Sequence, residues 1–190
     1  MKKLVALSLL MVCGAANAAT YEIDPMHTNA RFGIDHFATS TNVGGFYGLT
    51  GNLQFDRTAR TGSIDITIPV KNLQSGSEAF TGHLKSADLF NAAAYPTMRF
   101  VSTKFNFSRF GDEPKVTSVD GNLTLLGKTH PVRLKAHKFN CYDSPMLKTE
   151  VCGGDFSVTI DRSQWGMNYL LDAGMTKDVR IDIQVEAAKK

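Results

Sequence analysis

Two runs of alternating apolar and polar residues, both within residues 23–56, constrain the fold of this chain most strongly. The residues that share an apolar face are Ala30, Phe32, Ile34 and His36 in the first run, and Tyr47, Leu49, Gly51, Leu53 and Phe55 in the second. A period of two places alternate side chains on one side of a β-strand, so each run predicts a strand with one buried face. The Gly-rich polar stretch between the runs is expected to be a break between two strands.

The same alternation recurs along the rest of the chain. Further runs cover residues 64–70, 98–102, 119–125, 132–136, 156–160 and 179–185. With the two opening strands they give about eight strands, the number that closes a small antiparallel barrel. The sequence therefore predicts an all-β barrel.

Residues 77–95 are the exception, because they lack alternation, are rich in alanine and end before Pro96. Phe80 and Leu84 lie at helical spacing, and residues 86–88 could start a second short helix. We expect this small helical insert to cover one end of the barrel.

Residues 1–18 have the features of a cleaved secretory signal peptide: Lys2 and Lys3, an apolar run over residues 4–12, and Ala16-Asn17-Ala18 as the cleavage site. The apolar run is much shorter than the roughly 20 residues of a membrane-spanning helix. Lipid attachment at Cys13 is the other alternative, although Val12 is bulky where that signal needs a small residue. We therefore expect residues 19–190 to be one domain located in the periplasm.

The charge balance of the expected mature chain argues against nucleic-acid binding. Removal of Lys2 and Lys3 leaves 19 basic residues against 18 acidic ones, whereas nucleic-acid binders carry a basic face.

Cys141 and Cys152 are the two cysteines that remain after cleavage. In an oxidising compartment, a disulfide is the preferred interpretation of such a pair. A metal site or a redox couple is the alternative, but the usual CxxC spacing and nearby histidine ligands are absent.

The sequence contains no motif for catalysis. It has no GxSxG, no HExxH and no phosphate-binding glycine loop, and its five histidines do not form local metal-binding pairs. We therefore predict neither catalytic residues nor a metal site, although histidines distant in sequence could still converge on a metal. His36 is either a hydrogen-bonded core residue or a polar group that meets the head group of a ligand. Trp165, Met167 and Tyr169 form either ordinary core or the rim of an apolar pocket.

The predicted inner faces suggest an apolar cavity. An eight-stranded barrel is just wide enough to be filled by side chains or to hold one small ligand. Small residues at Ala30, Gly51, Gly121 and Ala136 leave room among the larger apolar ones. Because these faces carry almost no charge, a ligand is expected to be long and apolar.

Several motifs resemble the YceI-like family of exported, lipocalin-like polyisoprenoid-binding proteins, and together they extend over essentially the whole expected mature chain. They are Asp24-x-x-His27 with Phe32 and His36, Gly45-Phe46-x-Gly48-Leu49-x-Gly51 with Phe55-Asp56, His83-Leu84-Lys85-Ser86-Ala87-Asp88-x-Phe90, Tyr95-Pro96-x-x-x-Phe100-x-Ser102-Thr103, and Gly121-Asn122-Leu123-Thr124-x-x-Gly127-Lys128-Thr129-x-Pro131-Val132. The cysteine pair and the segment 162–169 resemble one branch of that family only.

The resemblance implies an extended eight-stranded antiparallel barrel with a small helical insert, whose apolar tunnel holds a polyprenyl chain or an isoprenoid quinone. The residues predicted to line this tunnel are Phe32, Ile34, His36, Phe46, Leu53, Phe55, Ile66, Leu84, Leu89, Phe90, Met98, Phe100, Leu123, Leu125, Trp165, Met167 and Tyr169. His36, Arg162 and Tyr169 are the candidates for contact with the head group.

The leading hypothesis is thus a binding or carrier protein for an isoprenoid lipid, with no catalytic cofactor, no membrane span and transient contact with a membrane or an acceptor protein. A filled barrel that acts through its surface is the first alternative. A barrel-pocket enzyme is the second, and it would need groups such as His27, Asp35 and His83 to line one cavity.

Overall fold

A computed structural model describes residues 18–109 and 115–190 of the chain. Its elements are β1 (Ala19–Ile23), β2 (Asn29–His36), β3 (Ser40–Tyr47), β4 (Thr50–Asp56), β5 (Thr61–Pro69), the 3-10 helix η1 (Val70–Asn72), β6 (Leu73–Gln74), α1 (Glu78–Lys85), β7 (Thr97–Phe107), β8 (Val116–Leu125), β9 (Lys128–Asp143), β10 (Glu150–Asp161), the 3-10 helix η2 (Arg162–Trp165) and β11 (Asp178–Lys189). The predicted signal peptide lies outside the described residues apart from Ala18, and so does Cys13.

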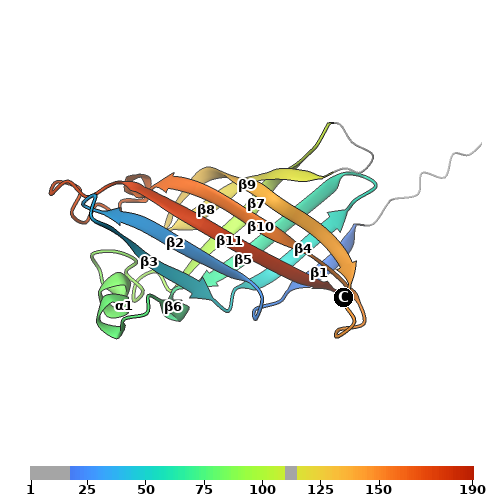
Figure 1. Ribbon diagram of the computed structural model, residues 1–190, viewed down its shortest axis with the longest axis horizontal. Coiled ribbons are helices and arrows are strands. Elements are labelled where there is room, and N and C mark those ends of the chain that lie inside the picture. Colours follow the sequence, from blue (N-terminus) through green and yellow to red (C-terminus); the bar gives the residue numbers. More distant parts are fainter. Residues whose placement is uncertain (1–17, 110–114) are drawn as a thin grey trace, which may run out of the picture.

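Eight strands form a closed antiparallel ring. They neighbour one another in the order β1, β4, β5, β7, β8, β9, β10 and β11, and β11 pairs with β1 to close the barrel. The predicted eight-stranded barrel is therefore confirmed. β11 is the long red strand that crosses the middle of Figure 1.

One edge of β11 is shared by two strands. Its residues 179–184 pair with residues 29–34 of β2, whereas its residues 187–189 pair with residues 21–23 of β1. β1 and β2 therefore lie end to end along β11, and β3 and β6 extend the wall from β2.

Apolar side chains face one another across neighbouring strands inside the barrel. Leu53 of β4 pairs with Ile64 of β5. Ile66 of β5 pairs with Phe100 of β7, which also pairs with Leu123 of β8. All of them are buried or half-buried, so the alternation in the sequence becomes a continuous apolar inner surface.

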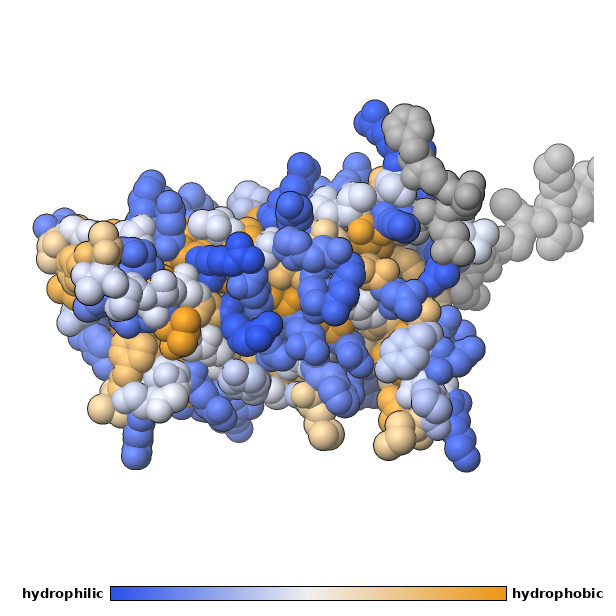
Figure 2. All heavy atoms as spheres, viewed as in Figure 1, coloured by the Kyte–Doolittle hydropathy of each residue, from blue (hydrophilic) through white to orange (hydrophobic). Residues whose placement is uncertain are grey.

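The outer surface carries the polar half of the same alternation. Arg99 pairs with Asp65 there, and Arg133 pairs with Asp120. In Figure 2 the visible wall is covered mostly by hydrophilic side chains, with apolar atoms showing at the two ends and in patches between them. Among the described residues, no helix has the length and hydropathy needed to cross a membrane.

The helical insert lies at one end of the barrel, as the sequence predicted, and forms part of the cavity wall there. α1, residues 86–96, η2 and residues 166–177 gather at this end, which we call the α1 end (Figure 1). The Ser77 side chain caps α1 by accepting a hydrogen bond from the Phe80 amide at 3.4 Å. The C-terminus and the β9–β10 hairpin lie at the opposite end.

The predicted second helix does not form. Residues 86–95 make consecutive turns, in which the amides of Asn91 and Tyr95 donate to the carbonyls of Ser86 and Asn91. Asn91 has a positive φ of 43°, which interrupts a right-handed helix. The alanine-rich composition favoured a helix over these residues, but the positive φ of Asn91 produces a turn instead.

The predicted break between the first two strands is wrong, because residues 40–47 form β3. This strand pairs with β2 along its whole length. Gly44 belongs there because a Cβ atom at this position would lie 2.6 Å from Phe32 Cζ. Tyr47 is the last residue of β3 and is exposed, so it does not share the inner face of Leu49 and Leu53 as predicted.

Two of the small residues expected to leave room do not do so. A Cβ atom at Gly121 would clash with the Phe100 ring, and one at Gly51 would clash with the Asp65 carbonyl oxygen. These glycines admit a neighbouring ring and a neighbouring backbone, respectively, so the space that they leave is filled by protein.

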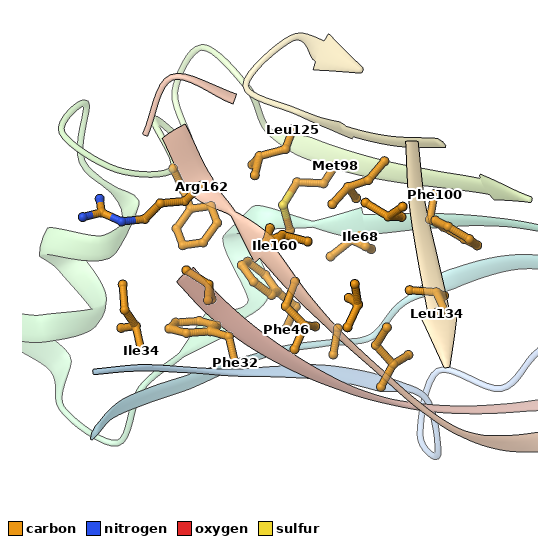
Figure 3. A pocket seen from close by; sticks show the side chains of 18 of the residues that line it. Phe32, Ile34, Phe46, Ile68, Met98, Phe100, Leu125, Leu134, Ile160 and Arg162 are labelled. Carbon is orange, nitrogen blue, oxygen red and sulfur yellow. The ribbon is translucent and has the colours of Figure 1, made fainter. Parts of the chain in front are cut away.

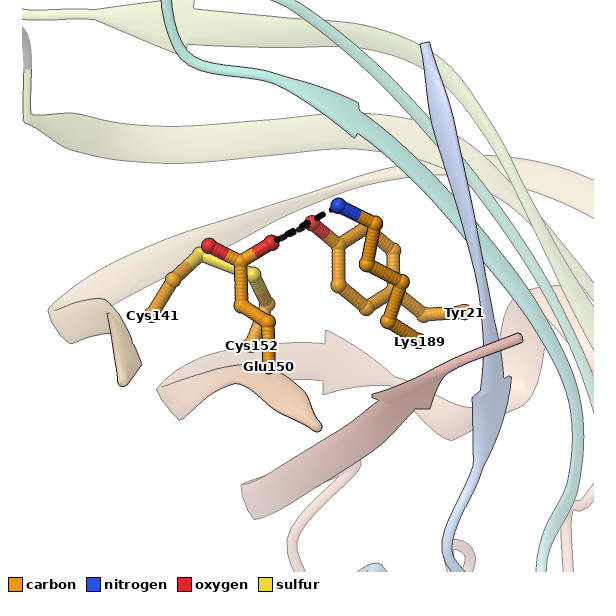
Figure 4. The surroundings of a disulfide bond; sticks show 5 residues. All are labelled: Tyr21, Cys141, Glu150, Cys152 and Lys189. Atoms are coloured by element: carbon orange, nitrogen blue, oxygen red, sulfur yellow. Dashed lines mark hydrogen bonds and ion pairs between the residues drawn. A yellow bond between two sulfur atoms is a disulfide. The ribbon is translucent and has the colours of Figure 1, made fainter. Parts of the chain in front are cut away.

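The predicted disulfide is present and joins Cys141 to Cys152 across the β9–β10 hairpin. Close by, the Tyr21 hydroxyl donates to Glu150 at 2.5 Å, and Lys189 lies 3.7 Å from the same carboxylate (Figure 4). Burial, and then the hydrogen bond to Glu150, raise the pKa of Tyr21 above its usual range.

Candidate functional site

The barrel encloses one large apolar cavity, with a volume of about 360 Å³. Its wall comes from strands all around the ring, and α1 and the 166–177 segment complete it at the α1 end. Figure 3 shows this interior, with aromatic and aliphatic side chains converging from opposite walls. The volume falls within the range of ordinary small-molecule sites, about 300–1,000 Å³.

Fifteen of the seventeen residues predicted to line a tunnel do line this cavity. They are Phe32, Ile34, His36, Phe46, Leu53, Ile66, Leu84, Leu89, Phe90, Met98, Phe100, Leu123, Leu125, Met167 and Tyr169. The structure thus brings them together from separate parts of the chain, while their contact with a ligand stays a prediction.

Phe55 and Trp165 do not line the cavity. The Phe55 ring packs on Phe139, with ring centroids 4.8 Å apart, and stacks on Phe107. Trp165 is only 2% exposed, and its indole nitrogen donates to the Leu123 carbonyl at 3.1 Å. Of the two interpretations of Trp165, ordinary core is therefore correct.

Other lining residues were missed although their signal was present. The inner faces of β10 and β11 contribute Phe156, Val158, Ile160, Val179, Ile181, Ile183 and Val185. The alternation of these residues predicted the strands, but a single sequence does not show which strands of the barrel line the cavity. Phe105 and Phe139 come from parts of β7 and β9 beyond the runs recognised in the sequence.

The cavity reaches the molecular surface at the α1 end. Tyr169 and Leu170 line it there, although they are 37% and 36% exposed. The His83 ring of α1 packs edge-on against Tyr169, with centroids 5.0 Å apart. Nearby, Phe90 packs edge-on against Phe46 at 5.1 Å. A chain inside the barrel could therefore place a polar end at this mouth.

Among the described residues, Arg162 is the only one on the cavity wall with a permanent charge. It is 2% exposed and bonds to backbone carbonyls: Nε donates to Thr176, Nη1 to Met167 and Nη2 to Tyr169, at 2.8–3.1 Å. Burial lowers the pKa of Arg162, whereas the nearby charge of Asp161 opposes this. These bonds hold the 166–177 segment over the mouth.

Asp161 is engaged by other groups. Its carboxylate accepts hydrogen bonds from the Lys177 ammonium at 2.9 Å and from the Ser163 hydroxyl at 2.5 Å. Lys177, and then Ser163, lower the pKa of Asp161 to about 2.

The titratable groups considered for an enzyme or a metal site do not converge. Of His27, Asp35 and His83, only His83 lines the cavity. His27 instead pairs with Asp24 at 2.6 Å on the surface. In the described part of the chain, Cys141, Glu150 and Cys152 form one group spaced for a metal ion, but its two sulfur atoms are bonded to each other.

Comparison of the sequence with protein families and with known proteins identifies relatives of this chain. The YceI-like domain matches residues 21–187. A UPF0312 protein from Shewanella denitrificans is 31% identical over 187 residues, which cover 90% of this chain and 96% of that protein.

Two solved structures share the fold. A YceI protein from Campylobacter jejuni has a TM-score of 0.67 at 22% identity, and the match covers 83% of this chain and 90% of that one. A polyisoprenoid-binding domain from Saccharophagus degradans has a TM-score of 0.64 at 11% identity, covering 91% and 99%. Because the family match extends from β1 to β11, this chain belongs to the YceI-like domain family.

Proposed function

We propose that this protein binds and carries an isoprenoid lipid, an isoprenoid quinone or a polyprenyl chain, in the periplasm and performs no covalent chemistry. The observation that carries the proposal is the apolar cavity, whose wall is aromatic and aliphatic from β2 around to β11. The polyisoprenoid-binding domain with the same fold supports the ligand class. The signal-peptide pattern of residues 1–18 supports export.

The energetics of burial favour a ligand of several isoprene units. Each buried CH₂ contributes about 0.8 kcal/mol, so one five-carbon unit contributes about 4 kcal/mol. Association and ordering of the ligand cost about 4–15 kcal/mol. A few buried units therefore outweigh that cost, and a dissociation constant below 1 μM, about −8 kcal/mol, is within reach.

A chain-length series tests this proposal on delipidated protein. Prenols of two to eight isoprene units are titrated by calorimetry, with straight-chain alcohols of equal carbon number as controls. We expect affinity to rise with each unit until the cavity is full and then to level off, with prenols ahead of the straight chains. Affinity that is independent of chain length would contradict binding in the cavity and favour a filled barrel.

Export is tested separately. The full-length chain is expressed in a bacterium, the cell is fractionated, and the intact mass of the protein is measured. We expect a periplasmic protein that begins at Ala19. A cytoplasmic protein that retains residues 1–18, or one with lipid attached at Cys13, would contradict this part of the proposal.

A further inference from the structure

The polar side chains on the cavity wall include basic groups but no carboxylates among the described residues. They belong to His36, Asn42, His83, Arg162 and Tyr169, and the described residues that line the cavity include no aspartate and no glutamate. The wall thus carries one guanidinium and two imidazole groups but no carboxylate among the described residues. An apolar cavity made only to hold hydrocarbon needs none of them.

Arg162 forms no ion pair with a carboxylate in the described part of the chain, although the charge of Asp161 lies close enough to favour its cationic form. Its partners are three neutral carbonyls, and it belongs to none of the ion pairs formed by the described residues. The adjacent Asp161 carboxylate is paired with Lys177. A guanidinium has five N–H donors, so two remain after these three bonds.

The guanidinium of Arg162 lies where one end of a ligand bound in the cavity would lie. In Figure 3 the Arg162 guanidinium points toward the α1 end, away from the apolar interior around Phe100 and Leu134. His83 and Tyr169 lie at the same mouth, and the Tyr169 carbonyl is bonded to Arg162 itself. A ligand that fills the barrel with its hydrocarbon chain would thus bring its head group to a buried cation.

We propose that this site selects long-chain ligands with an acidic oxygen head group, a carboxylate or a phosphate, over neutral alcohols and quinones, and that Arg162 determines this preference. The proposal rests on the function proposed above. A buried cation that forms no direct ion pair is costly, and a ligand anion offsets that cost. Carboxylate and phosphate oxygens also match the paired donors of a guanidinium, which makes charge-assisted hydrogen bonds.

The competing interpretation is that Arg162 only clamps the 166–177 segment. Its three carbonyl bonds would then be its whole role, and removing it would weaken all ligands alike through loss of order at the mouth. The two interpretations differ in one observable, the ratio of affinities for an acid and its neutral counterpart.

The experiment measures that ratio on the wild-type protein with matched pairs. Farnesyl monophosphate is compared with farnesol, and farnesoic acid with its methyl ester, by calorimetry at pH 7.5. We expect each acid to bind at least tenfold more tightly than its neutral partner, as a charge-assisted hydrogen bond in a buried site implies. The pair with the larger ratio distinguishes a phosphate site from a carboxylate site.

Equal affinity within both pairs would overturn the preference and leave the isoprenoid-carrier function standing. Absence of binding by all four compounds would instead contradict the carrier function itself. Because these comparisons use wild-type protein, they decide the matter even where a variant does not fold.

Two variants then assign the preference to its residue. Arg162→Gln removes the buried charge, and Arg180→Gln removes an exposed charge of β11 that does not line the cavity. We expect Arg162→Gln to bring the acid-to-neutral ratio within twofold of one, whatever affinity all ligands lose through disorder of the 166–177 segment, and Arg180→Gln to keep the wild-type ratio. Folded Arg162→Gln protein with an unchanged ratio, or an equal loss for all four compounds, would contradict the role of Arg162.

Discussion

At the residue scale, the size of the side chain at a single position determines whether the space beside it is filled by a neighbouring ring, by backbone or by the cavity. Gly121 illustrates this best, because the space beside its Cα is occupied by the Phe100 ring. That ring in turn forms part of the cavity wall. Gly121, which was expected from the sequence to leave empty space, is thus part of the packing that forms the cavity wall.

Substituting alanine at two glycines should give opposite effects on stability. Gly121→Ala drives a methyl group into Phe100, and overpacking of this kind costs about 1–3 kcal/mol. Gly82→Ala lies in α1 with open space around the new Cβ, where it should stabilise by about 0.5–1 kcal/mol. Denaturant unfolding measures both free energies. Equal effects of the same sign would contradict the packing described for Gly121.

A charge inside the cavity should abolish lipid retention. Leu84 is buried on α1 and lines the cavity, so Leu84→Arg places a cation where it cannot be hydrated. Ala79→Arg, on the exposed side of the same helix, adds the same charge at the surface. We expect the first variant to lose most of its bound lipid and the second to keep it, as extraction and quantification would show. Equal lipid content in the two folded variants would count against the cavity as the site.

Asp161 should contribute to acid sensitivity. Hydrogen bonding holds its pKa at about 2 in the folded protein, against an ordinary value of 3.8. Because the folded-state pKa is the lower one, its stabilising contribution is complete above about pH 4 and is lost as the pH falls toward 2. The melting temperature of wild type should therefore exceed that of Asp161→Asn at pH 7, and the gap should shrink between pH 4 and pH 2. A gap that does not depend on pH would refute this role.

At the scale of elements, the strand pattern was predictable and the connections were less so. Period-two alternation located the inner faces of β2, β4, β5, β7, β8, β9, β10 and β11. It missed β1, which is short, and β3, whose glycines and small polar residues resemble a loop. β3 is a strand because its partner β2 supplies the hydrogen bonds and Phe32 fills the space over Gly44. Such tertiary contacts are invisible in a local pattern.

The disulfide should stabilise the fold without taking part in binding. Cys141 and Cys152 do not line the cavity, and their hairpin projects from the end opposite α1. Closing a loop of eleven residues in sequence contributes about 2–3 kcal/mol by the loop-entropy account. Replacing both cysteines by serine should therefore lower the melting temperature and leave prenol affinity within about twofold, which calorimetry would measure. Loss of binding in a folded double variant would make this hairpin part of the site.

At the scale of the whole molecule, the sequence predicted a barrel of eight strands but not how it closes. Closure depends on β11 serving both β1 and β2 along one edge, which is a pairing between the two ends of the chain. The candidate site, like the barrel, was predictable only in part. Inward residues follow from alternation, whereas the mouth depends on Arg162 holding the 166–177 segment by bonds to backbone carbonyls. Side-chain to backbone bonds of this kind leave no pattern in a sequence.

The most direct test of the lipid-carrier account is native mass spectrometry of protein purified from periplasm without detergent, followed by organic extraction and identification of the lipid. The account predicts one isoprenoid molecule per protein molecule in wild type and in Ala79→Arg, with little or none in Leu84→Arg. Protein that carries no lipid, and that also rejects added quinone, polyprenol and prenyl phosphate, would contradict the account and favour a filled barrel that acts through its surface.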